Sequence, residues 1–217
     1  MMKEDSKKAY IRTFFRFAQY FTYIIYKLLF RISIKGINNI PLTGGVIIAS
    51  NHASILDPPA LGCVMPREVS FFAKKELFPV PLVGWFISYT KAIPVDRKGH
   101  SANALKAMMK YLKKGRAVVI FPEGTKTKTG EFLKPKSGAG MAAVIADVPV
   151  VPCWIQGSFK AKPLASKLTI HFLTPFRPDE IKAQTKKEHY LLVSERIIYD
   201  INKLYEKHMA VLNKAKS

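Results

Sequence analysis

The sequence predicts an α/β domain built around a mainly parallel or mixed central sheet flanked by helices. After residue 31, short apolar runs alternate with longer stretches of helical periodicity, which is typical of strands joined through helices. Polar clusters follow several of these runs directly, as expected where strands end in loops at one edge of a sheet. An amphipathic segment precedes this pattern. We therefore expect an N-terminal helical segment at 1–35 and an α/β domain at 36–217.

The N-terminal segment has the pattern of a helix that lies on a membrane rather than across it. Its uncharged stretch between Arg16 and Lys27 is ten residues long, whereas a spanning helix needs about 20. Apolar residues recur three or four positions apart, opposite a face of arginine, lysine, glutamine and tyrosine. The apolar stripe comprises Ile11, Phe14, Phe15, Ala18, Phe21, Ile25, Leu28, Leu29 and Ile32. This favours a membrane-interface helix; the alternative is a helix that packs on its own domain. No signal-peptide cleavage pattern follows, so we expect the segment to stay on the mature chain.

Six apolar runs have the length and composition of strands. They are Val46–Ala49, Val69–Phe72, Ala92–Val95, Ala117–Phe121, Val150–Ile155 and Leu168–Phe172. The first and the fourth of these runs are each followed at once by polar residues. We therefore expect those two loops to face one crevice beyond the carboxyl ends of the strands.

Helix start and stop signals lie between these runs. Asp57 is followed by two prolines, as in a helix cap with prolines in the first turn. A second helix is expected from Ser101 to the lysines before Gly115, because cations in the last turn and a following glycine are stop signals. Thr185 and Glu188 have capping-box spacing and open a long C-terminal helix with a core-facing apolar stripe.

The charge balance requires a negatively charged partner. The chain has 35 Lys and Arg against 15 Asp and Glu, a formal net charge of +20 over 217 residues. Candidate partners are an anionic membrane surface, an acidic carrier protein, a phosphorylated substrate or nucleic acid. The aromatic residues concentrate in the N-terminal stripe and no nucleic-acid-binding motif is present, so we expect no nucleic acid. Cys63 and Cys153 stand in apolar surroundings without metal-ligand spacing, which predicts buried thiols and no metal site.

His52 and Asp57 are the first candidate catalytic residues. A neutral imidazole is suited to removing a proton near pH 7, and a carboxylate on its other nitrogen fixes the tautomer and stabilises the imidazolium. The five-residue separation lets a carboxylate at the start of a helix reach back to a histidine at the end of a strand. The alternative for Asp57 is a plain helix cap.

Four segments in a fixed order carry a family resemblance. They are Asn51-His52-Ala53-Ser54-Ile55-Leu56-Asp57, Ile93-Pro94-Val95-Asp96-Arg97, Phe121-Pro122-Glu123-Gly124-Thr125 and Val148-Pro149-Val150-Val151-Pro152. In sequence and order they resemble the glycerolipid acyltransferases, most closely the bacterial 1-acylglycerol-3-phosphate acyltransferases. The first segment is the His-x4-Asp motif of that family, and the resemblance covers about residues 36 to 160.

The resemblance implies a role for each matching residue. His52 is expected to be the general base for the acceptor hydroxyl and Asp57 its orienting partner, without a covalent acyl-enzyme on Ser54. Arg97 is expected to hold the acceptor phosphate, because a guanidinium pairs two phosphate oxygens at once. The residues expected to shape the same pocket are Glu123, Gly124, Thr125 and Lys126. For Glu123, a helix-start contact and a hydrogen bond to the acceptor hydroxyls are both open. Lys126 and Thr127 stand where the family usually has arginine and serine.

The implied activity is transfer of a fatty acyl group from a thioester to the sn-2 hydroxyl of 1-acyl-sn-glycerol 3-phosphate (lysophosphatidic acid), which forms phosphatidic acid. Acyl carrier protein and acyl-CoA are both open as acyl donors, and no further cofactor is expected. Glycerol 3-phosphate and a lyso amino-acid lipid are alternative acceptors. A non-catalytic basic peripheral membrane protein is the alternative outside the enzyme class. The expected location is peripheral, on the cytoplasmic face of the cell membrane, with anionic lipid as partner.

Overall fold

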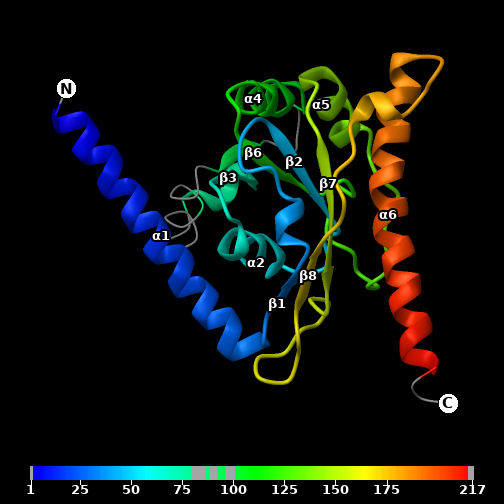
Figure 1. Cartoon of the computed structure of the whole chain (residues 1–217), viewed down its shortest axis with the longest axis horizontal. Helices are drawn as coiled ribbons and strands as arrows, with labels where there is room; N and C mark the ends of the chain where they lie inside the picture. Colours follow the sequence, from blue (N-terminus) through cyan, green and yellow to red (C-terminus); the bar gives the residue numbers. More distant parts are fainter. Residues whose placement is uncertain (1, 80–86, 88–91, 96–100, 215–217) are drawn as a thin grey trace.

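The computed structural model describes residues 2–79, 87, 92–95 and 101–214, and its centre is a six-stranded sheet (Figure 1). The strand order is β1-β8-β7-β2-β6-β3, and every neighbouring pair is parallel except the antiparallel pair β7 and β8. A separate parallel pair is formed by β4 and β5. The strands are β1 (Ser33–Lys35), β2 (Val46–Ser50), β3 (Val69–Ser70), β4 (Phe72–Lys74), β5 (Ile93–Val95), β6 (Ala117–Ile120), β7 (Val150–Gln156) and β8 (Thr169–Phe172). The predicted mixed, mainly parallel α/β fold is confirmed.

Helices cover both faces of the sheet. They are α1 (Met2–Phe30), α2 (Asp57–Val64), α4 (Ser101–Lys113), α5 (Gly138–Ala146) and α6 (Lys186–Lys214), with 3-10 turns at Ile37–Asn39, Lys75–Leu77 and Pro178–Glu180. Buried side chains of α1 and α2 share one apolar cluster with the sheet, and those of α4, α5 and α6 share another. The sheet is therefore the middle layer of three.

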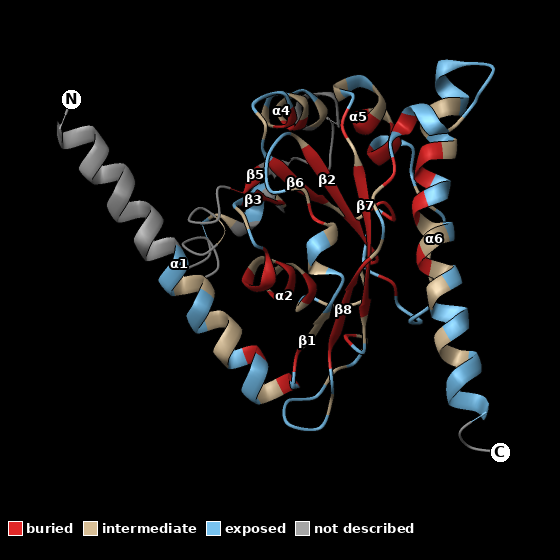
Figure 2. Cartoon of the chain, viewed as in Figure 1, coloured by how far each residue is buried: buried red, intermediate tan, exposed pale blue. Residues whose placement is uncertain are grey.

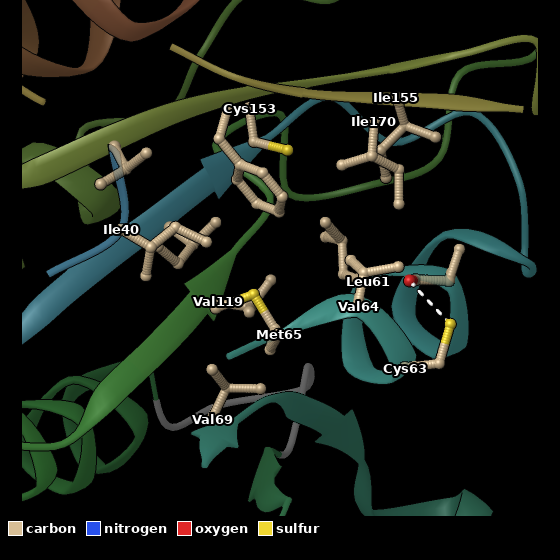
Figure 3. Packing of buried hydrophobic residues seen from close by; sticks show 14 of the residues in the cluster. Ile40, Leu61, Cys63, Val64, Met65, Val69, Val119, Cys153, Ile155 and Ile170 are labelled. Carbon is tan, nitrogen blue, oxygen red and sulfur yellow. Dashed lines mark hydrogen bonds between the residues drawn. The ribbon is translucent and has the colours of Figure 1, made fainter. Parts of the chain in front are cut away.

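Alternation along the buried strands divides the core into these two layers. In β2, Ile48 belongs to the cluster under α1 and α2, whereas Ile47 and Ala49 belong to the cluster under α4, α5 and α6, as the period of two along a strand requires. Every residue of β2 is buried (Figure 2), which explains its continuous apolar run. Figure 3 shows the first cluster, where the thiol of Cys63 donates to the carbonyl of Ala60. Cys153 is buried in the same cluster, and both thiols are free.

Two strand predictions need correction. The predicted run Val69–Phe72 is divided between β3 in the main sheet and β4 in the small sheet. β1 was not predicted; it is three residues long and pairs with β8 from Ser33 to Lys35. A strand this short is set by its partner rather than by its own pattern.

The C-terminal helix begins as its capping signal predicts. The hydroxyl of Thr185 accepts a hydrogen bond from the Glu188 amide, while the Glu188 carboxylate accepts one from the Thr185 amide. Further along, α5 packs closely on α6 because Gly140 has no side chain. A Cβ there would collide with the Tyr190 carbonyl, and the Gly140 amide donates to the hydroxyl of Ser194. The small residues of α5 therefore serve helix packing.

Helix α1 packs on α2 through one face and leaves apolar side chains exposed on another. The amide of Gln19 donates to the carbonyls of Gly62 and Met65 at the end of α2. Tyr26 and Phe30 are buried in the core, whereas the exposed apolar side chains are Phe17, Tyr20, Phe21, Ile25 and Leu28. The alternative that the helix packs on its own domain therefore holds for one face, and the membrane-interface interpretation of the exposed face stays a prediction. Within the described part of the chain, no helix is long and apolar enough to cross a membrane.

Candidate active site

The His52–Asp57 pair forms directly beyond the carboxyl end of β2. The strand ends at Ser50, a short loop follows, and α2 begins at Asp57. Nδ1 of His52 lies 2.9 Å from Oδ2 of Asp57. The histidine side chain is 19% exposed and that of the aspartate is fully buried. Since the carboxylate fixes Nδ1, the ring presents Nε2 as the atom that can accept a proton.

A network of backbone donors holds the Asp57 carboxylate. Its Oδ2 accepts hydrogen bonds of 2.7 Å from the amides of Ala53 and Ser54, in addition to the contact with His52. Asp57 also lies in the first turn of α2, where the helix dipole favours a negative charge. These contacts stabilise a carboxylate that burial alone would disfavour. Asp57 is the first residue of the helix, and the cap is Leu56. The Asp57 side chain bonds the histidine and the two loop amides.

Glu123 links the loop after β2 to a second loop that carries Leu133. Its Oε1 accepts from the backbone amide of His52 and its Oε2 from that of Leu133, both at 2.9 Å. The residue is 3% exposed. Burial raises the pKa of the Glu123 carboxyl, against the opposing effect of the two amides. Each of the two oxygens thus accepts a hydrogen bond from a backbone amide, one of which belongs to His52.

Residues that follow β6 also contact the backbone and the ring of His52. The Thr127 amide donates to the His52 carbonyl at 2.9 Å, and the imidazole stacks on Phe121 with 4.1 Å between ring centroids. The buried Thr127 hydroxyl accepts from the amides of Thr129 and Gly130. Sequence reasoning assigned no role to Thr127. The signal was available, because Thr127 stands where the resemblance implies another hydroxyl residue, a serine.

The remaining predicted pocket residues lie on the exposed loop after β6. Gly124 has φ of 71°, a conformation that favours glycine, and a Cβ there would lie 3.0 Å from the Lys136 side chain. Thr125 and Lys126 are exposed beside it. Their loop is tied to His52 through Glu123 and Thr127. Arg97 lies outside the described residues, so its phosphate-binding role stays a prediction.

Tyr26 connects α1 to the loop after β2. Its hydroxyl donates to the Leu56 carbonyl at 2.9 Å, one residue before Asp57. Burial raises the pKa of the Tyr26 phenol above its ordinary value, so the group stays a neutral donor. The N-terminal helix is therefore attached to the site itself. Sequence reasoning missed this contact because a tyrosine on an amphipathic helix gives no sign of its tertiary partner.

The Ser54 hydroxyl takes part in the local turn. Its Oγ accepts from the Leu56 amide at 3.2 Å, and its own amide donates to Asp57. This arrangement stabilises the loop between β2 and α2 and gives Ser54 no bond to the imidazole. Among the described residues, no group of three or more side chains is arranged to hold a metal ion.

A histidine–carboxylate pair beyond the carboxyl end of a parallel strand is an arrangement typical of an enzyme active site. Residues 31–156 match the Acyltransferase family. The chain belongs to this family and is an acyltransferase.

Characterised relatives agree with this assignment. The chain is 32% identical to the 1-acyl-sn-glycerol-3-phosphate acyltransferase of Bacillus subtilis over 172 residues, which is 78% of this chain and 85% of the relative. It is 33% identical to the enzyme of the same name from Helicobacter pylori, over 68% of this chain and 69% of that one. The crystal structure of the 1-acyl-sn-glycerophosphate acyltransferase from Thermotoga maritima superposes with a TM-score of 0.72 at 25% identity, covering 94% of this chain and 83% of that one. The fold and the activity class are thus shared.

Proposed function

We propose that this enzyme acylates the sn-2 hydroxyl of 1-acyl-sn-glycerol 3-phosphate from an acyl thioester and so forms phosphatidic acid. The observation that carries the proposal is the His52–Asp57 contact of 2.9 Å at a partly exposed imidazole. The relatives are named as 1-acyl-sn-glycerol-3-phosphate (LPA) acyltransferases, which supports lysophosphatidic acid as the acceptor.

In the proposed reaction His52 is the general base. Its Nε2 takes the proton of the acceptor hydroxyl while the hydroxyl oxygen bonds to the thioester carbonyl carbon. Asp57 keeps Nδ1 protonated and stabilises the imidazolium that forms. The carbon–sulfur bond then breaks, and the departing thiolate takes the proton from His52. No covalent acyl-enzyme is needed, which agrees with the Ser54 hydroxyl accepting its bond from the Leu56 amide.

The acceptor phosphate would be bound by cations beside the loop after β6. Arg97 is the proposed bidentate ligand. The exposed loop lysines that add positive charge are Lys126, Lys128, Lys134 and Lys136. Glu123 contributes by holding the loops that carry His52 and Leu133 in register.

The acceptor would reach the site from a membrane. The exposed apolar face of α1 supports peripheral association, which we place on the cytoplasmic face where anionic lipids and the acyl donor meet. Both acyl carrier protein and acyl-CoA carry the thioester that the mechanism requires.

One experiment tests the proposal. The purified protein is incubated with lysophosphatidic acid, glycerol 3-phosphate and a lyso amino-acid lipid, each with both donors, and the products are identified by mass spectrometry. Phosphatidic acid from the first acceptor is the expected product. Acylation of another acceptor alone would reassign the substrate, and no acylation in any combination would contradict the proposed activity.

A further inference from the structure

The loop between β7 and β8 is long for an antiparallel connection, and hydrogen bonds attach it to the end of α1. It runs from Gly157 to Leu168, whereas hairpin loops usually have two to about five residues. Its tip contacts the end of α1 through two hydrogen bonds. The Leu164 amide donates to the Leu29 carbonyl, and the Arg31 guanidinium donates to the Leu164 carbonyl at 3.4 Å. The Leu168 amide donates to the Phe30 carbonyl. The loop thus satisfies carbonyls that the end of a helix leaves free, and Figure 1 shows both segments together.

Leu164 lies at the tip of this loop with an exposed side chain and an unfavourable backbone conformation. It is 65% exposed and has φ of 65°, a backbone conformation that costs a leucine energy. The turn around it is fixed, because the Lys162 amide donates to the Ser166 hydroxyl and the Ser166 amide donates to the Lys162 carbonyl. A strained, fixed and exposed leucine is a sign of function rather than of packing.

The surroundings of Leu164 are positively charged and partly apolar. The loop carries Lys160, Lys162 and Lys167 and has no acidic residue, and the sequence has no Asp or Glu between Asp5 and Asp57. None of the three lysines forms an ion pair with a described residue. The adjoining last turn of α1 exposes a second leucine, Leu28, at 67%.

The loop lies at the same edge of the sheet as the active site. β7 pairs in parallel with β2, so the segments after both strands leave the sheet at one edge. Phe159 of the loop packs against Gly130, where a Cβ would lie 2.9 Å from the phenylalanine ring. The amide of Gly130 in turn donates to Thr127, which holds the His52 carbonyl.

We infer that the β7–β8 loop is a second membrane contact, which inserts Leu164 among the headgroups of an anionic bilayer beside the last turn of α1. Lysines around an apolar tip match lipid phosphates around an acyl boundary. Contact at two separate elements would fix the edge of the sheet that carries His52 toward the lipid surface. The inference rests on the proposed membrane-borne acceptor.

The direct test is sedimentation with vesicles of equimolar phosphatidylcholine and phosphatidylglycerol at low salt, without substrate. Leu164→Asn removes the apolar side chain while keeping a residue that tolerates positive φ. Leu42→Asn is the matched control, because Leu42 is 66% exposed and precedes β2 at the opposite edge of the sheet. We expect Leu164→Asn to weaken vesicle partitioning about five- to tenfold and Leu42→Asn to leave it unchanged. Equal binding of parent and Leu164→Asn, or equal loss in both variants, would overturn the inference.

A second variant tests the charges. Changing Lys160, Lys162 and Lys167 together to Gln should weaken binding to these vesicles on the order of a hundredfold at low salt, with a smaller effect on phosphatidylcholine alone. Unchanged vesicle binding, with loss of activity on acyl carrier protein but not on acyl-CoA, would make the loop a carrier-protein site and overturn the inference.

Activity on detergent-dispersed lysophosphatidic acid separates this inference from the proposed function. Leu164→Asn should match the parent there, and a loss would show a structural role and overturn the membrane contact. An inactive parent that still binds vesicles through Leu164 would contradict the proposed function alone.

Discussion

The Asp57 carboxylate has two roles in the structure. It orients the His52 ring and it closes the loop by accepting from the amides of Ala53 and Ser54. The second role explains how Oδ2 can be buried, since the amides of Ala53 and Ser54 replace its hydration. The other oxygen, Oδ1, is buried without a partner among the described residues.

Asp57→Asn is expected to lower kcat by about 10²–10⁴-fold, the range of a positioned base. An amide can accept the loop hydrogen bonds but cannot stabilise an imidazolium. Steady-state kinetics on lysophosphatidic acid measures the change, and thermal unfolding of the same variant reports on the loop. A variant with kcat near the parent value would remove Asp57 from the mechanism.

Glu123→Gln should separate positioning from substrate binding. A glutamine has one acceptor oxygen for two backbone amides, so one buried amide loses its partner, at about 1–3 kcal/mol. Because the amides of His52 and Leu133 use both carboxylate oxygens, we expect lower kcat and lower stability with little change in the acceptor KM. A raised KM with normal kcat would instead indicate direct contact with the acceptor.

At the scale of elements, α1 has two working faces. Gln19 and Tyr26 attach one face to α2 and to the loop after β2, and the exposed aromatic and aliphatic side chains lie on another face. The helix therefore positions the site with one face and is proposed to bind lipid with another.

Replacing Phe17, Phe21 and Leu28 with Ser should abolish most vesicle binding. At about 25 cal/mol per Å² of apolar surface, three large side chains contribute at least ~3 kcal/mol, on the order of a hundredfold in partitioning. Activity on vesicle-borne acceptor should fall with binding, while activity in detergent is retained. The matched control changes three exposed side chains of α6, Tyr199, Val211 and Leu212, to Ser. If the α1 variant still sediments with vesicles as the control does, α1 is not the lipid-binding element.

A single amide joins β8 to α6 through two histidines. The Gln156 side chain bonds the imidazole of His208 at 2.6 Å and that of His171 at 3.2 Å. The stacked Trp154 ring covers His171. Burial, and then the charges of Lys35 and His208, lowers the pKa of His171 to about 4.

This lowered pKa predicts an acid-sensitive contact. Between the ordinary pKa of histidine, about 6.5, and the folded value of about 4, the unfolded chain binds more protons than the folded one. Stability from this group is therefore complete above the unfolded pKa and is lost as the pH falls through that window. Melting temperatures across the window should fall less steeply for His171→Gln than for the parent. Parallel curves for the two proteins would contradict the assignment.

At the scale of the whole molecule, sequence patterns predicted those features that depend on residues close together in the chain. The spacing from His52 to Asp57 placed a carboxylate beside an imidazole because a tight loop and a helix start bring them together. The strand runs of β2, β6 and β7 were predicted because burial on both sides makes them continuously apolar.

Contacts made across the fold could not be predicted in this way. The partner of Glu123 in the second loop, Leu133, contributes only a backbone amide, which any residue type supplies. The attachment of α1 through Gln19 and Tyr26 depends on where α2 and the loop before it lie, which the periodicity of α1 alone does not predict. β3 and β4 enter different sheets because of neighbours far along the chain.

The most direct test of the account is the rate of phosphatidic acid formation from lysophosphatidic acid by His52→Ala, measured by mass spectrometry. His189→Ala is the control. This histidine lies on α6, bonds the carbonyl of Pro178 and is far in sequence from the loop after β2. We predict a loss of about 10²–10⁴-fold for His52→Ala with an unchanged melting temperature, and near-parent activity for the control. A folded His52→Ala enzyme that forms phosphatidic acid within a few-fold of the parent rate would contradict the account.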